Sequence, residues 1–242
     1  MTRTGRLCVA VDLEGYSRRS HAGQEHAQDV LRTLLDLLWQ RVAPGAVERQ
    51  PNGDGEVALL DETVGIGVVP ELLRVLRNGL RRANPDDRVG ERYRLRAAAD
   101  HGPAGRARNG FAGDAVVRTC RLLDSAAARD ALDTRPGSDL SVVLSGSLFD
   151  ALAADPAARA ALPAAEFVPV RVVDPAKSFA APAWVHAGAP FPAPRGAAGP
   201  RPAAPTGDAM RVEVADGGQV GAIVQVRELR GGLVLGRPGE PR

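Results

Sequence analysis

Residues 47–60 read Val47-Glu48-Arg49-Gln50-Pro51-Asn52-Gly53-Asp54-Gly55-Glu56-Val57-Ala58-Leu59-Leu60, a polar approach followed by an apolar exit. Two glycines bracket Asp54 between these halves, as the tight turn of a β-hairpin requires. Asp-Gly is a common hairpin dipeptide, so this segment on its own indicates a turn and nothing more. It becomes a candidate site only together with a second carboxylate.

That second carboxylate is Asp12, which ends the apolar run Leu7-Cys8-Val9-Ala10-Val11. The run is typical of a buried strand. Two acids at the edges of neighbouring strands can hold a hard divalent cation between them, so the pair favours a metal site over two unrelated loop acids. Such a site requires both carboxylates close to a common point, because cation–oxygen distances are about 2.0–2.6 Å.

Composition allows one sizeable domain in the 242 residues, of which 44% are hydrophobic and only 4% aromatic. The formal charge of +2 gives no argument for nucleic acid or a membrane surface as a partner. No segment reaches the roughly 18 apolar residues of a membrane helix, so we expect a cytoplasmic protein. Cys8 and Cys120 both lie in apolar patterns, which favours buried thiols over a disulfide or a nucleophile.

Hydrophobic periodicity predicts the order β-α-β-β-α-β for the first hundred residues. The predicted elements are a strand at 6–13, a helix stopped by Pro44-Gly45, the hairpin at 46–60, a helix at 66–83 and a strand at 92–99. This order is the split βαβ, or ferredoxin-like, unit. It brings the first strand beside the hairpin in one antiparallel sheet, as Asp12 and Asp54 need in order to converge.

Further elements follow the ferredoxin-like core. They are a Gly-rich loop at 109–114, a helix at 114–132, a strand at 141–144, a helix capped by Ser145, and a hairpin of 167–173 with 183–186. The predicted fold class is therefore α+β, with extra strands after the ferredoxin-like core.

Composition changes sharply after His186. Residues 188–208 are mostly Ala, Pro and Gly and indicate a flexible linker. Residues 209–242 contain short β-prone stretches and are too few to bury a core. We therefore expect a domain over 1–187, the linker, and a short C-terminal interaction motif over 209–242.

Four motifs follow one another along the predicted domain. They are Asp12-Leu13-Glu14-Gly15-Tyr16-Ser17, Gly53-Asp54-Gly55, Asp100-His101-Gly102-Pro103 and Gly113-Asp114-Ala115-Val116-Val117-Arg118-Thr119-Cys120-Arg121-Leu122. Their order and spacing resemble the catalytic domain of class III nucleotidyl cyclases, the adenylate and guanylate cyclase family, over residues 5–187. The resemblance implies a ferredoxin-like core working as a head-to-tail homodimer, with ATP or GTP at the dimer interface. The Arg, Ala, Gly and Pro content indicates a GC-rich bacterial genome, which fits bacterial signalling.

The resemblance also implies roles for single residues. Asp12 and Asp54 match the aspartates that hold two divalent cations, Mg²⁺ or Mn²⁺, with the Leu13 carbonyl assisting. Arg121 matches an arginine that stabilises the transition state from the other subunit, and Lys177 lies near the place of a triphosphate-binding lysine. The implied products are cAMP or cGMP and pyrophosphate. From the residues alone, Arg121 and Lys177 are equally explained as solvated surface side chains.

Three positions depart from the pattern of the family. Val117 stands where the family has an asparagine that binds the ribose. Gln50 stands at a base-selecting position that often holds lysine or glutamate, and the other base-reading position, near Gly110, has no acid. Gly53, next to the metal aspartate, completes the predicted substrate-binding set with Gln50, Val117 and Lys177. Loss of one orienting contact costs on the order of 10²-fold in rate.

A second hypothesis is a catalytically degenerate, cyclase-fold nucleotide sensor or adaptor that assembles through its tail. Ile223-Val224-Gln225-Val226 and Gly231-Gly232-Leu233-Val234 are apolar and low in charge, a composition that stacks in cross-β assemblies. The tail resembles the C-terminal amyloid-type signalling motifs of bacterial proteins, although Arg227 stands where those commonly have Gly. A partner protein with a similar motif would bind it. A third hypothesis, a dinucleotide-forming polymerase relative, lacks its Gly-Gly-Asp/Glu-Glu/Asp-Phe signature here.

Overall fold

A computed structural model describes residues 5–84 and 92–187 of the chain. The chain divides into two units, Met1–Pro194 and Arg195–Arg242, and the second lies outside the described residues. The predictions for the linker at 188–208 and the motif at 209–242 therefore fall on residues that are not described.

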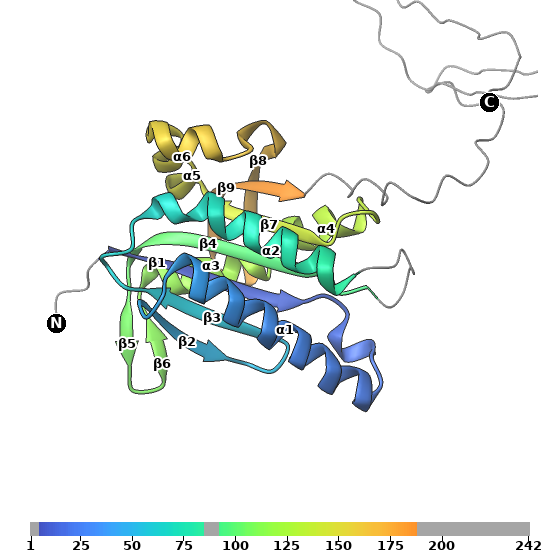
Figure 1. The fold of residues 1–242 in the computed structure, drawn as a ribbon. Coiled ribbons are helices and arrows are strands. Elements are labelled where there is room, and N and C mark those ends of the chain that lie inside the picture. The colour runs from blue at the N-terminus through green and yellow to red at the C-terminus, as the bar shows by residue number, and fades with distance from the viewer. Residues whose placement is uncertain (1–4, 85–91, 188–242) are drawn as a thin grey trace, which may run out of the picture. The chain divides into compact units, whose positions relative to one another are not determined.

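Seven strands form one mixed sheet in the order β2-β3-β1-β4-β7-β9-β8 (Figure 1). Their bounds are β1 Gly5–Leu13, β2 Val47–Pro51, β3 Gly55–Leu60, β4 Leu95–Pro103, β7 Leu140–Ser145, β8 Phe167–Asp174 and β9 Phe179–Ala187. Only β4 and β7 pair in parallel; every other neighbouring pair is antiparallel. The order of the first four strands is that of a ferredoxin-like unit, so the α+β prediction is confirmed.

Helices cover both faces of the sheet (Figure 1). The helices are α1 His21–Val42, α2 Val69–Ala83, α3 Asp114–Leu123, α4 Ala126–Asp133, α5 Gly146–Ala154 and α6 Pro156–Ala161, with 3-10 turns η1 Tyr16–Arg18, η2 Ile66–Val68, η3 Ala164–Glu166 and η4 Pro175–Lys177. Helices α1, α2, α5 and α6 pack on one face over a core rich in large leucines. Helices α3 and α4 pack on the other face over mostly smaller side chains.

Alternation along β1 decides which side chains reach which face. Leu7, Val9 and Val11 point into the core beneath α1 and α2. Cys8 and Ala10 point to the opposite face, beneath α3. Successive side chains of a strand alternate between faces, so the α3 side of the sheet also receives Asp12, at the end of this strand.

Three local features differ from the sequence expectation. The helix expected over 114–132 is two helices, because the Ser125 hydroxyl accepts from the Ala128 amide and starts α4 afresh. The expected Gly-rich loop at 109–114 contains strand β6 Gly110–Ala112, which forms a two-stranded hairpin with the preceding β5 Gly105–Ala107. Helix α6 was not expected; Asp155 caps it and Pro156 occupies its first turn.

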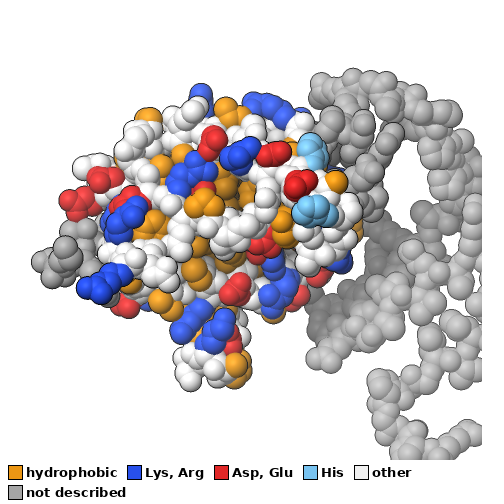
Figure 2. Space-filling model, turned by 90° about the horizontal axis from the view of Figure 1, so that it is seen from below, with side chains coloured by type: hydrophobic (Ala, Val, Ile, Leu, Met, Phe, Trp, Pro, Cys, Tyr) orange, Lys and Arg blue, Asp and Glu red, His pale blue; other side chains and the backbone are white. Residues whose placement is uncertain are grey.

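The surface carries charge of both signs in an interspersed pattern, as Figure 2 shows for the face seen from below. Many of these charges are locally paired, for example Arg74 with Glu71 and Arg32 with Asp29. In the described part of the chain, no helix combines the length and apolarity needed to cross a membrane.

The β2–β3 hairpin sits unusually close to β1 at Gly55. A Cβ atom at this position would lie 2.3 Å from the Val11 carbonyl oxygen and 2.9 Å from Asn52 Oδ1. The first of these atoms belongs to the backbone of a central strand and cannot move aside cheaply. Glycine is therefore required where the hairpin meets the end of β1.

We predict that Gly55→Ala lowers the free energy of unfolding by about 2–4 kcal/mol, because strand β1 or the hairpin must shift to accept the methyl group. Urea unfolding followed by circular dichroism measures the change. Gly65→Ala is the matched control, since a Cβ atom there meets nothing within 4 Å and its φ of −67° suits any residue. Equal stability of the two variants would contradict this explanation of Gly55.

A buried histidine joins α2 to the last strands of the sheet. His186 is fully buried, and its Nε2 lies 2.8 Å from Glu166 Oε2 and 3.0 Å from Arg77 Nη2. Burial lowers the pKa of His186; Glu166 opposes this effect, whereas the positive charges of Arg77 and Arg135 add to it. The neutral imidazole is therefore favoured in the folded protein.

This pKa shift predicts a pH dependence of stability. Because an unfolded histidine titrates near 6.5, the unfolded state binds more protons than the folded state below that pH. The free energy of unfolding should therefore fall as pH drops from about 7.5 to 5.5, with a slope of up to about 1.4 kcal/mol per pH unit. His186→Gln should flatten the profile, and the exposed His101→Gln should not. A flat wild-type profile would contradict the assignment.

Candidate active site

The candidate site begins at the end of β1, where Asp12 is paired with an arginine. Asp12 lies opposite Arg96 of β4 in the strand register. Arg96 Nε donates to Asp12 Oδ1 at 2.9 Å, and Arg96 Nη2 donates to Asp12 Oδ2 at 2.5 Å. The exposed fractions of the two side chains are 16% for Asp12 and 17% for Arg96, so solvent reaches this bidentate pair.

The hairpin brings the second aspartate to the same end of β1. The Leu13 amide donates to the Asp54 carbonyl oxygen at 2.8 Å, and Asp12 is the register partner of Gly55. Gly53 starts the turn with a φ of +89°, a left-handed value that glycine adopts without strain. The structure thus brings Leu13, Asp54 and Asp12 together at one corner of the sheet.

The electrostatics of Asp12 reflect this crowding. Burial raises the pKa of Asp12 above its usual value, and the charge and hydrogen bonds of Arg96 act against that rise. The negative charges of Asp54 and Asp124 raise the pKa further, which places both acids within electrostatic reach. When a carboxylate is partly desolvated and lies near two other acids, a nearby positive charge stabilises its ionised form.

The structure places one residue that was not expected, Arg96, beside the predicted metal ligand Asp12. Asp12 was expected as a free ligand, whereas here Arg96 neutralises it. Within residues 5–84 and 92–187, no group of three or more Asp, Glu, His and Cys side chains is arranged to hold an ion. A cation at this corner would therefore have to share Asp12 with Arg96 and take most of its ligands from elsewhere.

Helix α3 carries the other two residues taken from the cyclase motif. Val117 is 47% exposed, so this apolar side chain faces outward from the helix. The Arg121 guanidinium carbon lies 5.1 Å from the centre of the Phe179 ring on β9, and this stacking restrains the side chain without consuming its charge.

Lys177 lies near the same end of α3. Its Nζ is 3.7 Å from Asp124 Oδ2, at the C-terminal cap of α3, and 3.7 Å from Asp174 Oδ2. The structure therefore brings Lys177 to Asp124, which follows Arg121 by three residues at the end of α3. These long ion pairs are exposed and easily exchanged for an anionic ligand.

The two positions that the resemblance assigns to base reading lie against each other. A Cβ atom at Gly110 would lie 2.1 Å from Gln50 Oε1, so the amide of Gln50 covers this glycine. The backbone of Gly110 is left-handed, with a φ of +90°. The position near Gly110 thus has no side chain because Gln50 fills its space, and the amide presents both a donor and an acceptor there.

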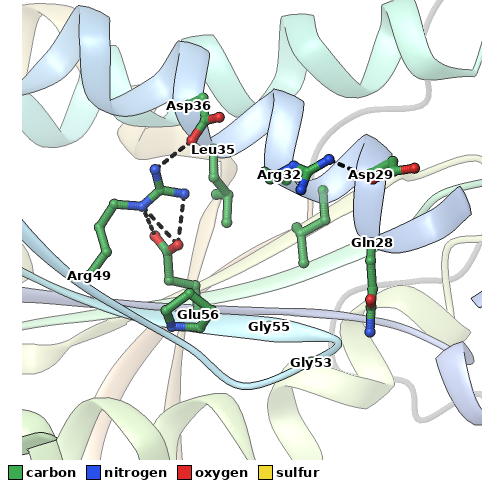
Figure 3. Close-up of a pocket in the computed structure, with 11 residues that line it drawn as sticks. Gln28, Asp29, Arg32, Leu35, Asp36, Arg49, Gly53, Gly55 and Glu56 are labelled. Atoms are coloured by element: carbon green, nitrogen blue, oxygen red, sulfur yellow. Dashed lines mark hydrogen bonds and ion pairs between the residues drawn. The ribbon is translucent and has the colours of Figure 1, made fainter. Parts of the chain in front are cut away.

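A cavity of about 570 Å³ lies on the opposite side of the hairpin, between it and α1 (Figure 3). Arg49 spans its wall, bonding Glu56 at 2.8 Å and Asp36 at 2.5 Å. Glu56 is only 3% exposed and also accepts from Trp39 Nε1 at 2.7 Å. This network fixes the hairpin to α1 and supports the turn that carries Asp54.

Sequence reasoning missed the roles of two residues that shape the site. Arg96 was placed on a strand, but its pairing with Asp12 depends on the strand register. Glu56 was treated as part of an apolar exit strand and is instead a buried charged anchor. Asp100, the first residue of the third motif, is a fully buried carboxylate within β4. Both acids carried a readable signal, because an acid beside an apolar run needs a partner when buried.

Known structures share this architecture. No protein-family model matches the sequence, and no curated protein matches it either. A solved adenylate/guanylate cyclase/hydrolase from Silicibacter pomeroyi is similar at a TM-score of 0.58 and 16% identity, over 77% of this chain and 98% of that one. The catalytic core of a rhodopsin-guanylyl cyclase with converted specificity, solved in complex with ATPαS, is similar at a TM-score of 0.53 and 15% identity, over 77% and 97%.

Both similar structures are cyclase domains, and this chain spans nearly their whole length. At these identities the likeness concerns the fold, which agrees with the sheet order and with the motif order along the sequence. The described part of this chain therefore has the fold of the adenylate and guanylate cyclase catalytic domain.

Proposed function

We propose that the chain is a divalent-cation-dependent nucleotidyl cyclase, which converts ATP or GTP into a cyclic nucleotide and pyrophosphate. One observation carries the proposal. The Leu13 amide donates a hydrogen bond to the Asp54 carbonyl oxygen, and this bond holds the turn that carries Asp54 beside Asp12 at the end of β1. The surrounding fold is that of solved cyclases.

The residues at this corner fit a divalent cation shared with a polyphosphate. Asp12 and Asp54 would hold such an ion through their carboxylates, and the Leu13 carbonyl would add a third oxygen ligand of a kind that Mg²⁺ and Mn²⁺ accept. Phosphate and water would have to supply the remaining ligands, as is usual for nucleotide sites. An ion held there would supply two effects, a lower pKa of the ribose 3′-hydroxyl and an offset to phosphate charge.

Arg96 gains a role in this scheme. In the structure its guanidinium neutralises Asp12 through two hydrogen bonds. With a cation beside Asp12, the planar Arg96 guanidinium would be free to bind phosphate oxygens in the same bidentate manner. Arg96 thus keeps the partly buried carboxylate balanced until nucleotide arrives.

The remaining predicted residues act from a second copy of the chain. Arg121 and Lys177 of that copy would contact the phosphates, and Gln50 would contact the base. Ring closure joins the ribose 3′-oxygen to the α-phosphorus and breaks the bond from the α-phosphorus to the bridging oxygen. Pyrophosphate leaves, the hydroxyl proton passes to solvent, and the arginine stabilises charge on the α-phosphate oxygens.

A second candidate function is a nucleotide sensor or adaptor without turnover. Val117 favours it, because an outward-facing valine cannot hydrogen-bond a ribose. In this case the protein binds ATP or GTP unchanged and recruits a partner through residues 209–242. Calorimetric nucleotide binding without product, together with loss of self-association on deletion of 209–242, would select this function.

We predict that the purified protein forms a cyclic nucleotide from ATP or GTP with Mn²⁺ and that Asp54→Asn lowers the rate by about 10³-fold, equal to about 4 kcal/mol. The loss follows from removal of one of two cation-binding carboxylates. Asp133→Asn, an exposed change on α4, should keep the wild-type rate. Product formation is measured by chromatography. An Asp54→Asn variant as active as wild type would contradict the assignment.

We predict further that Val117→Asn raises turnover by about 10- to 10²-fold, since it restores an amide that can orient the ribose. The matched control is Val173→Asn, because Val173 on β8 is equally apolar and 57% exposed. Initial rates at saturating nucleotide separate the two variants. An unchanged rate in Val117→Asn would contradict the explanation that Val117 limits turnover because it cannot orient the ribose.

A further inference from the structure

Asp100 is a buried charge that the proposed chemistry does not use. It lies within β4, opposite Cys8 of β1, and none of its surface is exposed. Arg118 Nη1 of α3 donates to Asp100 Oδ2 at 3.1 Å, and the Ser145 hydroxyl donates to Asp100 Oδ1. An ionised buried carboxylate is tolerated only when it is paired and hydrogen-bonded, so these two contacts sustain its charge.

The cluster joins three separate elements. Asp100 belongs to β4, Ser145 ends β7, and Arg118 projects from the middle of α3. Ser145 also caps α5 by accepting from the Leu148 amide at 3.2 Å, so its position is fixed independently. Of the three groups, only Arg118 is partly exposed, at 38%, and it is the one that α3 contributes.

Helix α3 is also held by apolar contacts. The buried side chains beneath it are Cys8, Leu59, Ala104, Ala115 and Val116, and the end of the helix buries Leu122 and Leu123 in a neighbouring cluster. The ion pair with Asp100 adds a directional, charged attachment at the middle of the helix to this apolar packing.

We propose that Asp100 and Arg118 form a latch that fixes α3 on the sheet and so positions Arg121 for phosphate. Arg121 follows Arg118 by three residues, which places the two on neighbouring positions of the helix surface. Asp100 and Arg118 are positioning residues, because neither reaches the corner of Asp12 and Asp54. The statement about Arg121 rests on the proposed cyclase function, whereas the attachment of α3 does not.

Cys8 provides a direct reporter of the latch. It is fully buried beneath α3, and burial raises the pKa of its thiol to about 12. A thiol in this state reacts only when α3 moves away from the sheet. Alkylation of Cys8, quantified by peptide mass spectrometry on the full chain, therefore measures opening of α3.

The test compares Asp100→Asn and Arg118→Ala with wild type under conditions in which all variants are folded by circular dichroism. Both should raise the rate of Cys8 alkylation by about 10-fold or more, because each removes one charge of the buried pair. Arg118→Lys should restore most of the protection. Asp139→Asn is the matched control: Asp139 is also buried and paired with an arginine, Arg92 at 2.7 Å, but lies away from α3.

The control should lower overall stability without raising Cys8 alkylation. If Cys8 of Asp100→Asn and Arg118→Ala reacts at the wild-type rate, the latch is refuted. If alkylation rises equally in Asp139→Asn, the effect is general destabilisation and the latch is again refuted. Both outcomes are decided by the alkylation of Cys8 and do not depend on whether the protein is catalytically active.

Catalysis supplies the second readout. With an active wild type, Arg118→Ala should lower kcat by about 10-fold or more and leave KM within about threefold, because Arg121 acts on charge that develops in the transition state. If kcat stays unchanged while Cys8 alkylation rises, the claim that the latch positions Arg121 is refuted. An inactive wild type would contradict the proposed function, while the alkylation result would still decide the latch.

Discussion

The site depends on how closely the β2–β3 hairpin approaches the end of β1. The Leu13 amide bonds the Asp54 carbonyl, and Gly55 leaves no room for a side chain against the Val11 carbonyl. This contact is made by backbone atoms, so it fixes the hairpin whatever the surrounding side chains do. On the far side, Arg49 and Glu56 tie the same hairpin to α1 (Figure 3). The turn of Asp54 is thus held from both sides of the sheet.

Charge pairing is the second constraint on this fold. The described domain buries several ionised side chains, and each is balanced where it lies: Asp12 by Arg96, Glu56 by Arg49, Asp100 by Arg118 and Asp139 by Arg92. Buried pairs of this kind contribute little net stability, yet removing one partner is costly. They specify which strands and helices meet, and one of them, Asp12 with Arg96, lies at the corner where nucleotide chemistry is proposed.

Much of the architecture followed from sequence pattern. The turn at Gly53-Asp54-Gly55, the apolar run of β1, the periodicity of the helices and the helix stop at Pro44 are local signals, and they were enough to predict the ferredoxin-like order. The break between α3 and α4 was missed, although Ser125 is a readable cap. The β5–β6 hairpin was missed because its strands are only three residues each, too short to show a period.

The partners of the site residues were less predictable. Arg96 meets Asp12 only because β1 and β4 align in one particular register, which no local pattern encodes. The contacts of Arg121 with Phe179 and of Lys177 with Asp124 likewise depend on how the end of α3 packs beside β9. Which residues could carry chemistry was visible in the sequence, whereas which charges neutralise them required the fold.

The most direct measurement is a crystal structure of the full chain with Mn²⁺ and a non-hydrolysable ATP or GTP analogue, using the anomalous signal of manganese. The account predicts an anomalous peak between the carboxylates of Asp12 and Asp54, with Arg96 turned from Asp12 toward the phosphates. Manganese bound elsewhere, with the Asp12–Arg96 ion pair intact beside a bound nucleotide, would contradict it.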